Sequence, residues 1–179
     1  MRELVVEHNS FVWRSLRRLG VREADCADGC QRVWVVVARK LETIQSGKLE
    51  SYLFSVLVRI ASDMRRYNAR RPDVDFDELE FEVAPDAEGA LEKRRARALL
   101  DEILSEMSWK LRTVFVMFEI EGFSALEIAE ALELRPGTVS SRLRLARRAF
   151  ERGVERQRAR LAPGVEQESP GAPCALRDS

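Results

Sequence analysis

The sequence predicts an all-α protein made of two small helical domains joined by an acidic linker. Apolar residues recur at helical spacing, and no stretch shows the convincing alternation of a half-buried strand. Residues 1–72 hold 14 Lys/Arg against 8 Asp/Glu, residues 73–92 hold 9 acidic residues and no basic one, and residues 93–162 hold 15 basic against 10 acidic. A chain of 179 residues has room for one ordinary domain or two small ones. Two basic blocks around an acidic connector favour two modules that face nucleic acid, although solvated helix faces would give the same balance.

The predicted N-terminal domain spans residues 1–70 and contains three to four helices. Its first helix ends at Gly20, because glycine readily takes the conformation that closes a helix. The apolar stripe of that helix consists of Val12, Leu16 and Leu19. Residues 22–42 and 49–69 are predicted as the second and third helices. The second contains the β-branched run VWVVV, yet its flanks keep helical spacing and a helix is favoured over a strand.

The predicted linker spans residues 71–91. It contains two prolines, and apolar residues alternate with its acidic ones. Such a segment either docks onto a surface or serves as a solvated spacer, and composition leaves both interpretations open. Residues 161–179 are rich in Pro, Gly and polar side chains and are predicted to be a disordered tail.

The predicted C-terminal domain spans residues 92–160 and contains four helices. Apolar spacing predicts the first two helices over residues 90–107 and 109–121. A short helix should follow, because Ser124 and Glu127 have the spacing of a capping box, in which each side chain satisfies the other residue's free backbone N–H.

The stretch PGTVSSRLRLARRAF (136–150) is predicted to be an amphipathic helix that begins at Pro136. On a helical wheel, one narrow stripe holds Val139, Leu143, Ala146 and Phe150. The opposite arc and its shoulder hold Ser140, Ser141, Arg142, Arg144, Arg147 and Arg148. A capped helix, a tight turn and a helix with a basic face together predict a helix-turn-helix that reads DNA, because arginine pairs with guanine or contacts phosphate.

The segment GFSALEIAEALELRPGTVSSRLRLARRAF resembles the −35-reading domain of bacterial sigma factors of the extracytoplasmic-function (ECF) group. The matching positions are Gly122, Ser124, Glu127, Ile128, Ala129, Leu132, Gly137, Thr138, Val139, Ser141, Arg142, Leu143, Ala146 and Arg147. The sequence departs from the family at Glu133, where many members have glycine, and at Leu145, where many have arginine. The resemblance implies that −35 DNA is contacted by Thr138, Ser140, Ser141, Arg142, Arg144, Arg147 and Arg148.

The N-terminal stretch ADCADGCQRVWVVVARKLE (24–42) is similar to the ECF helix that binds the clamp of the largest RNA polymerase subunit. Asp28, Gln31, Val33 and Trp34 match the family pattern, whereas Arg32 replaces a common glutamate. By resemblance, the residues that bind core polymerase are Asp28, Gln31 and Arg32.

Residues 47–71 resemble the ECF stretch that opens the −10 element. Tyr52 stands for the usual tryptophan and Arg59 for the usual asparagine. In the family, the loop before this helix, here Ser46–Ser51, holds a flipped base. Opening a duplex without ATP needs a pocket for an extruded base and cations for its phosphates. The implied −10 contacts are Lys48, Tyr52, Arg59, Asp63, Arg65 and Arg66.

The sequence is therefore identified as a member of the ECF sigma factors, which bind core RNA polymerase and promoter DNA and are usually held by an anti-sigma factor. We expect no enzymatic activity, no cofactor, no metal and no small-molecule substrate, because no catalytic set of residues is evident. One alternative is a stand-alone helix-turn-helix regulator. Another is an enzyme that uses Cys26 and Cys30 as a redox pair, which would need an exposed thiol of low pKa.

A cytoplasmic location is the expectation from the rest of the sequence. The first residues do not resemble a signal peptide, and the longest apolar run, VWVVVA (33–38), is too short to span a bilayer. Three cysteines do not make a disulfide framework.

Overall fold

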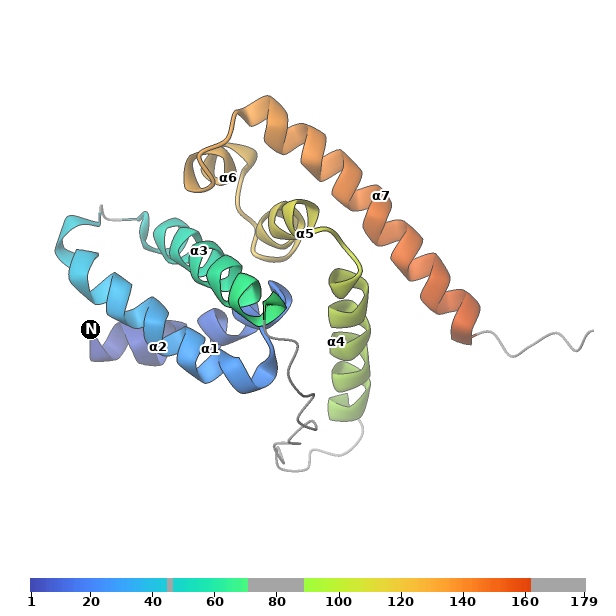
Figure 1. The fold of residues 1–179 in the computed structure, drawn as a ribbon, viewed down its shortest axis with the longest axis horizontal. Coiled ribbons are helices and arrows are strands. Elements are labelled where there is room, and N and C mark those ends of the chain that lie inside the picture. Colours follow the sequence, from blue (N-terminus) through green and yellow to red (C-terminus); the bar gives the residue numbers. More distant parts are fainter. Residues whose placement is uncertain (45–46, 71–88, 162–179) are drawn as a thin grey trace, which may run out of the picture.

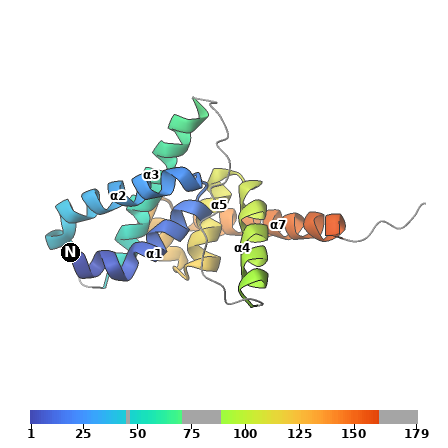
Figure 2. The same ribbon diagram turned by 90° about the horizontal axis from the view of Figure 1, so that it is seen from below.

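The computed structural model describes residues 1–44, 47–70 and 89–161, and within these ranges the chain forms helices and turns with no strand. The N-terminal elements are α1 (Arg2–Arg18), α2 (Glu23–Lys40), the short 3₁₀ helix η1 (Leu41–Thr43) and α3 (Leu49–Ala69). The C-terminal elements are α4 (Gly89–Ser105), α5 (Trp109–Phe115), the π-helical turn η2 (Val116–Ile120), α6 (Ala125–Ala131) and α7 (Pro136–Leu161). The all-α prediction is confirmed (Figures 1 and 2).

The predicted boundaries of the linker and tail fall largely outside the described residues. Residues 71–88 of the predicted linker and residues 162–179 of the predicted tail are not described. Whether the acidic segment docks onto a surface or serves as a solvated spacer therefore stays open. Helix α4 begins at Gly89, three residues before the predicted start of the C-terminal domain, and α7 continues to Leu161.

Helices α1 and α2 are joined by the turn that the sequence predicts at Gly20. Its φ is +87°, and the N–H groups of Gly20 and Val21 donate to the carbonyls of Arg17 and Leu16, which closes the end of α1. Leu16 and the other predicted stripe residues of α1 are fully buried. At Gly29 of α2 a Cβ would lie 2.8 Å from Leu16 Cδ1, so glycine permits the close approach of the two helices.

The helix-turn-helix begins with the predicted capping box. The Ser124 hydroxyl accepts from the Glu127 N–H, and the Glu127 carboxylate accepts from the Ser124 N–H at 2.8 Å. The Ser124 hydroxyl also donates to the Glu127 carboxylate at 2.7 Å, and this bond, together with the one from the Ser124 N–H, lowers the pKa of Glu127. After α6 the chain turns at Glu133, whose φ of +53° lies in the left-handed region that favours glycine. Helix α7 then begins at Pro136, as predicted.

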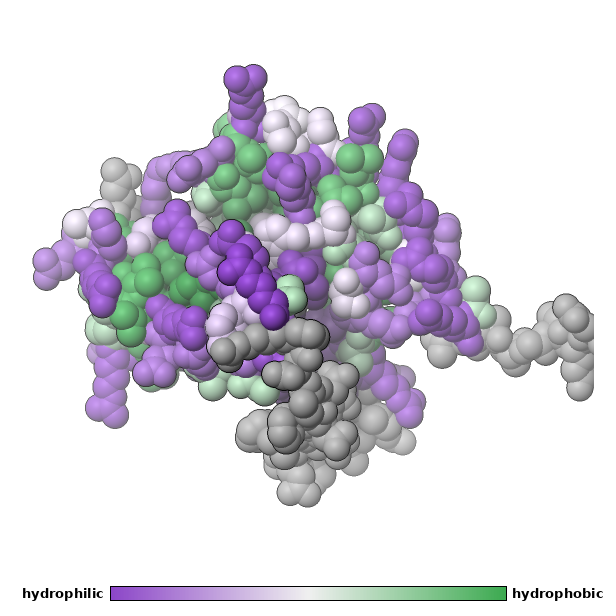
Figure 3. Space-filling view, in the orientation of Figure 1, coloured by the Kyte–Doolittle hydropathy of each residue, from purple (hydrophilic) through white to green (hydrophobic). Residues whose placement is uncertain are grey.

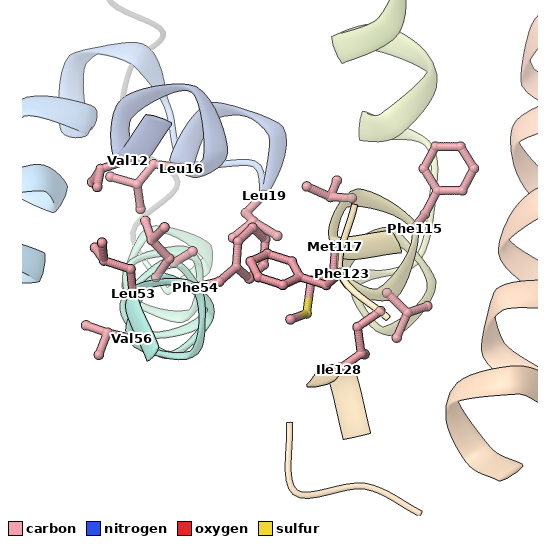
Figure 4. Packing of buried hydrophobic residues seen from close by; sticks show 14 of the residues in the cluster. Val12, Leu16, Leu19, Leu53, Phe54, Val56, Phe115, Met117, Phe123 and Ile128 are labelled. Atoms are coloured by element: carbon pink, nitrogen blue, oxygen red, sulfur yellow. The ribbon is translucent and has the colours of Figure 1, made fainter. Parts of the chain in front are cut away.

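A single core joins the two helical modules. The Phe54 ring of α3 meets the Phe123 ring at 5.4 Å between centroids, edge to face. Leu19 and Met117 are fully buried in the same cluster, and Figure 4 shows these side chains converging between the modules. The sequence predicts two small domains, and in the structure their buried apolar side chains form one cluster, because each small module leaves apolar side chains that the other one covers.

Polar contacts flank this shared core. The Arg18 guanidinium and the Ser15 hydroxyl donate to Glu121 Oε1 at 2.8 and 3.2 Å. Arg112 is 5% exposed and donates from Nε to the Arg18 carbonyl, and burial lowers the pKa of Arg112 to about 10. A Cβ at Gly20 would lie 2.6 Å from an Arg112 nitrogen, so this glycine also makes room for the arginine.

Candidate nucleic-acid and polymerase interfaces

Helix α7 lies along one outer edge of the molecule (Figure 1), and most of its predicted DNA-reading side chains are exposed. Figure 3 shows hydrophilic side chains along that edge, in the orientation in which Figure 1 labels α7. Val139 and Ala146 are fully buried and Leu143 nearly so, which anchors the helix as predicted. Phe150 is half-buried and stacks on Phe115 with 4.6 Å between ring centroids.

The predicted −35 residues all lie in the first half of α7, and most are exposed. Five are exposed, namely Ser140, Ser141, Arg144, Arg147 and Arg148, and two are half-buried, namely Thr138 and Arg142. The hydroxyls of Ser140 and Ser141 donate to the carbonyls of Pro136 and Gly137, at 3.2 and 2.9 Å. Their small side chains stay close to the helix, which lets the α7 backbone approach a groove. Leu145 is 48% exposed, so the position that departs from the family pattern lies at the surface.

One member of this set is held by a residue that sequence reasoning missed. Arg147 donates from Nε to Glu119 Oε1 at 2.6 Å, and its guanidinium lies 5.3 Å from the centroid of the Phe118 ring. The carboxylate and the ring hold Arg147 near the surface in one orientation. Glu119 lies 28 residues before Arg147, in η2, and no local pattern in the sequence relates the two.

Three of the six predicted −10 residues, Lys48, Tyr52 and Arg59, line a groove between α3 and α6, which we call the α3–α6 groove. Its volume is about 530 Å³. One wall comes from the end of α2, η1 and α3 and includes Lys48, Tyr52 and Arg59. The other wall comes from the helix-turn-helix and holds Glu127, Glu130, Ala131 and Glu133. A smaller hollow of about 260 Å³ between α3 and the helix-turn-helix also includes Arg59 on one side and Glu133 on the other.

The structure does not gather all six predicted −10 residues in this groove. Arg66 lines the smaller hollow and forms an ion pair with Asp63, one turn away on the exposed side of α3. Arg65 points elsewhere: its guanidinium lies 4.6 Å from the centroid of the Trp109 ring, between the modules, and burial lowers its pKa. The family pattern marks a basic position on α3 but cannot reveal which neighbour the side chain meets.

The predicted polymerase-binding residues form an exposed patch on α2. Asp28 and Arg32 pair at 2.7 Å, one helical turn apart, and Gln31 is exposed beside them. Val35 continues this side of the helix and is 47% exposed. Val35 is therefore a candidate polymerase contact. Helical periodicity did not single it out, because the VWVVV run has apolar residues on several sides of the helix.

The cysteines do not fit a redox site. Cys26 is fully buried, and burial raises the pKa of its thiol to about 12. Burial also raises the pKa of Cys30. A redox pair would need an exposed thiol of low pKa. Across the described ranges no group of three or more His, Cys, Asp or Glu side chains is arranged to hold a metal ion.

Within the described part of the chain, no helix has the length and apolar character needed to cross a membrane.

Comparison with known proteins places this chain among the sigma factors. The family model "Sigma-70 region 2" matches residues 4–71, and "Sigma-70, region 4" matches residues 90–150. The chain is 31% identical over 147 residues to the RNA polymerase sigma-E factor of Streptomyces coelicolor, and the match covers 80% of each. It is 31% identical over 150 residues to the ECF RNA polymerase sigma factor SigE of Mycolicibacterium smegmatis, covering 81% of this chain but 58% of that relative. This chain belongs to the ECF group of RNA polymerase sigma factors.

Solved structures share the fold. CnrH in complex with the cytosolic domain of CnrY aligns with a TM-score of 0.63 at 21% identity, covering 86% of both chains. The sigma factor RpoE of Bartonella quintana, in complex with the anti-sigma factor NepR, aligns with a TM-score of 0.66 at 18% identity, covering 86% of this chain and 96% of that one.

Proposed function

We propose that this chain is a transcription initiation factor that binds core RNA polymerase, recognises −35 and −10 promoter elements and promotes DNA opening. The observation that carries the proposal is the presence of both sigma regions in one chain. A stand-alone helix-turn-helix regulator would account for residues 90–150 but leave residues 4–71 without a role. Such a factor acts by binding, so we infer no enzymatic reaction, and it works where the polymerase and promoters are, in the cytoplasm.

The −35 element would be read by α7. Its arginines lie on an exposed helical face, its hydroxyl side chains are small, and its apolar stripe fixes the helix to the module. Arginines of this kind contact guanine or phosphate in the major groove. We assign this role to Thr138, Ser140, Ser141, Arg142, Arg144, Arg147 and Arg148.

The −10 element would be bound along α3. Lys48 and Arg59 supply cations for phosphates, and Tyr52 supplies an aromatic face on which a base can stack. Arg66 extends this basic surface with Asp63 beside it. Arg65 lies between the modules in this conformation, so a DNA contact from it requires the modules to separate.

Core polymerase would be bound by the exposed patch of α2, with Asp28, Gln31 and Arg32 supplying polar contacts and Val35 an apolar one. An anti-sigma factor is a further proposed partner, since the structures of RpoE with NepR and of CnrH with CnrY share this fold.

The proposal is tested by binding to purified core RNA polymerase. The wild-type chain should bind, and an Asp28→Ala, Gln31→Ala double variant should bind about tenfold or more weakly, because truncation of the few central contact residues of an interface costs about 2 kcal/mol or more. An exposed pair on α7, Glu151→Ala with Glu155→Ala, is the control and should bind like the wild type. Retention of duplex DNA binding without any core binding would contradict the proposal and leave a stand-alone regulator.

A further inference from the structure

The two walls of the α3–α6 groove carry opposite charge. Lys48 and Arg59 lie on the wall from α3 and its preceding loop, and Glu127, Glu130 and Glu133 lie on the α6 wall. Lys48 Nζ and Glu130 Oε1 are 2.9 Å apart and join the walls directly. We call the three glutamates the α6 acidic face.

The acidic face belongs to a stretch that is acidic throughout. Residues 119–133 contain five glutamates and no basic residue, although they form part of a DNA-binding module. Carboxylates near phosphates would oppose DNA binding. Here three of them line a groove whose other wall is basic, whereas Arg144, Arg147 and Arg148 are exposed on α7. The helix-turn-helix therefore separates its charges between two surfaces.

We propose that the α6 acidic face binds the α3–α6 groove in place of promoter DNA, so that α6 and the −10 strand compete for the same cations. The inference rests on the proposed −10 role of α3. Glu130 occupies the position beside Lys48 that a phosphate would take, and α6 fills the side of the groove from which a strand would reach Tyr52 and Arg59. The closed chain binds duplex through α7 but cannot take a melted strand along α3.

The ion pair between Lys48 and Glu130 is weak enough for a DNA strand to compete with it. The Lys48 and Glu130 side chains are 53% and 69% exposed, and exposed ion pairs are weak and screened by salt. The packing of the two modules against each other depends on the contact between Phe54 and Phe123. It also depends on the hydrogen bonds that Arg18 and Ser15 donate to Glu121. When the modules separate, a DNA strand that offers several phosphates can therefore take the place of the acidic face beside the cations of α3.

The first experiment locks the groove shut in a reversible way. A Lys48→Cys, Glu130→Cys chain is linked with a short bis-methanethiosulfonate reagent, which dithiothreitol cleaves. Cys174→Ser removes one native thiol, and Cys26 and Cys30 are buried. The same chain carrying a monofunctional reagent on both cysteines controls for the adduct. A matched link inside the C-terminal module, Glu106→Cys with Arg156→Cys, replaces an ion pair that joins α7 to the residue that follows α4.

Binding is measured with two fluorescent probes of randomised sequence, a short single strand and a duplex, at low salt. We expect the linked chain to bind the single strand at least about tenfold more weakly than the cleaved and monofunctional forms, because its competent state is no longer populated. Duplex binding should stay within about twofold, since the α7 face is open in both states. The control link should alter neither. Equal single-strand binding by linked and cleaved chains, or failure of the link to form, would overturn the inference.

The second experiment removes charge without a link. Glu130→Gln with Glu133→Gln should tighten single-strand binding about three- to tenfold at low salt, and the gain should shrink as salt screens the groove. Glu151→Gln with Glu155→Gln makes the same change in net charge on exposed residues of α7. An equal gain in both variants would mean that net charge alone matters and would overturn the inference.

The two proposals fail in different ways. If the cleaved chain binds neither core polymerase nor single-stranded DNA, the proposed function is wrong. If it binds both, and the link or the glutamates make no difference, the function stands and the competition is wrong.

Discussion

The α7 face and the α3–α6 groove differ in what lies over them. Helix α7 lies along the outer edge of the molecule with most of its predicted DNA-contacting arginines exposed, whereas the basic wall of α3 faces the glutamates of the helix-turn-helix. The two surfaces that are proposed to bind the same promoter therefore differ in how accessible they are to DNA. The α7 face can meet a duplex as it stands, and the groove has to be uncovered. Under the proposed function, −35 contact would come first and −10 contact would follow once the modules separate.

Phe123→Ala is expected to have the largest effect, because it removes the ring that packs the helix-turn-helix against α3 and so keeps the α3–α6 groove covered. Truncating a phenylalanine that is 7% exposed should lower the free energy of unfolding by about 3–5 kcal/mol. Urea denaturation followed by circular dichroism measures it. Leu126→Ala, on α6 at 70% exposure, should change stability by less than about 0.5 kcal/mol. Equal effects of the two substitutions would mean that the modules do not share a core.

A substitution on the exposed face of α7 should change duplex binding and leave the α3–α6 groove unaffected. Arg144→Ala should weaken duplex binding to a selected −35 sequence by about 1–3 kcal/mol if it contacts a base, and should weaken all sequences alike if it contacts phosphate. The measurement is fluorescence anisotropy at several salt concentrations. Arg158→Ala, an exposed residue in the last turn of α7, is the control and should have little effect. Unchanged affinity in the Arg144 variant would remove this residue from the reading face.

The start of α6 offers a smaller and more local test. Ser124→Ala removes one half of the capping box and should cost about 1 kcal/mol of stability. The pKa of Glu127 is lowered in the folded state by its hydrogen bonds to Ser124. Its contribution is therefore fully present above the unfolded pKa, about 4.3 for glutamate, and is lost as pH falls through the lower folded value.

Denaturation of the wild type and the Ser124→Ala variant from neutral to acidic pH checks this sign. The gap between the two stability curves should narrow as Glu127 becomes protonated. A gap of constant width would show that the Ser124 hydroxyl does not lower the pKa of Glu127.

The smallest expected effect concerns the orientation of Arg147. Glu119→Gln removes the negative charge 2.6 Å from its Nε, so the guanidinium becomes available to one more phosphate. Binding to duplex of randomised sequence should tighten a few-fold, and the slope of log affinity against log salt should steepen by about one. Glu155→Gln makes the same change in charge without touching Arg147 and should leave the slope unchanged. A slope unaffected by Glu119→Gln would mean that Arg147 does not meet DNA.

Local signals carried most of the correct sequence predictions. Gly20 and the Ser124–Glu127 capping box mark helix ends through bonds to near neighbours, whereas Pro136 marks a helix start because it has no N–H to leave unpaired. The structure has the expected ends. The apolar stripe of α7 was also predictable, because one helix sets its own periodicity.

The features that sequence reasoning missed are pairs between distant segments. Phe54 with Phe123, Arg65 with Trp109 and Glu119 with Arg147 each join separate elements. Nothing in either local pattern identifies the partner, since the pairing depends on how whole modules pack. Glu133 is an intermediate case: the absence of the family's glycine was visible, but the positive φ of its replacement was not.

The shared core also bears on how the protein is made. On the ribosome, Phe54 leaves the exit tunnel well before Phe123 has been synthesised, because the chain between them includes the whole linker and α4. The nascent N-terminal module thus spends part of translation with the apolar face around Leu19 and Phe54 uncovered. Faces of this kind are where aggregation begins and where chaperones bind. The aromatic contact that completes the folded protein is therefore also a point of exposure during its synthesis.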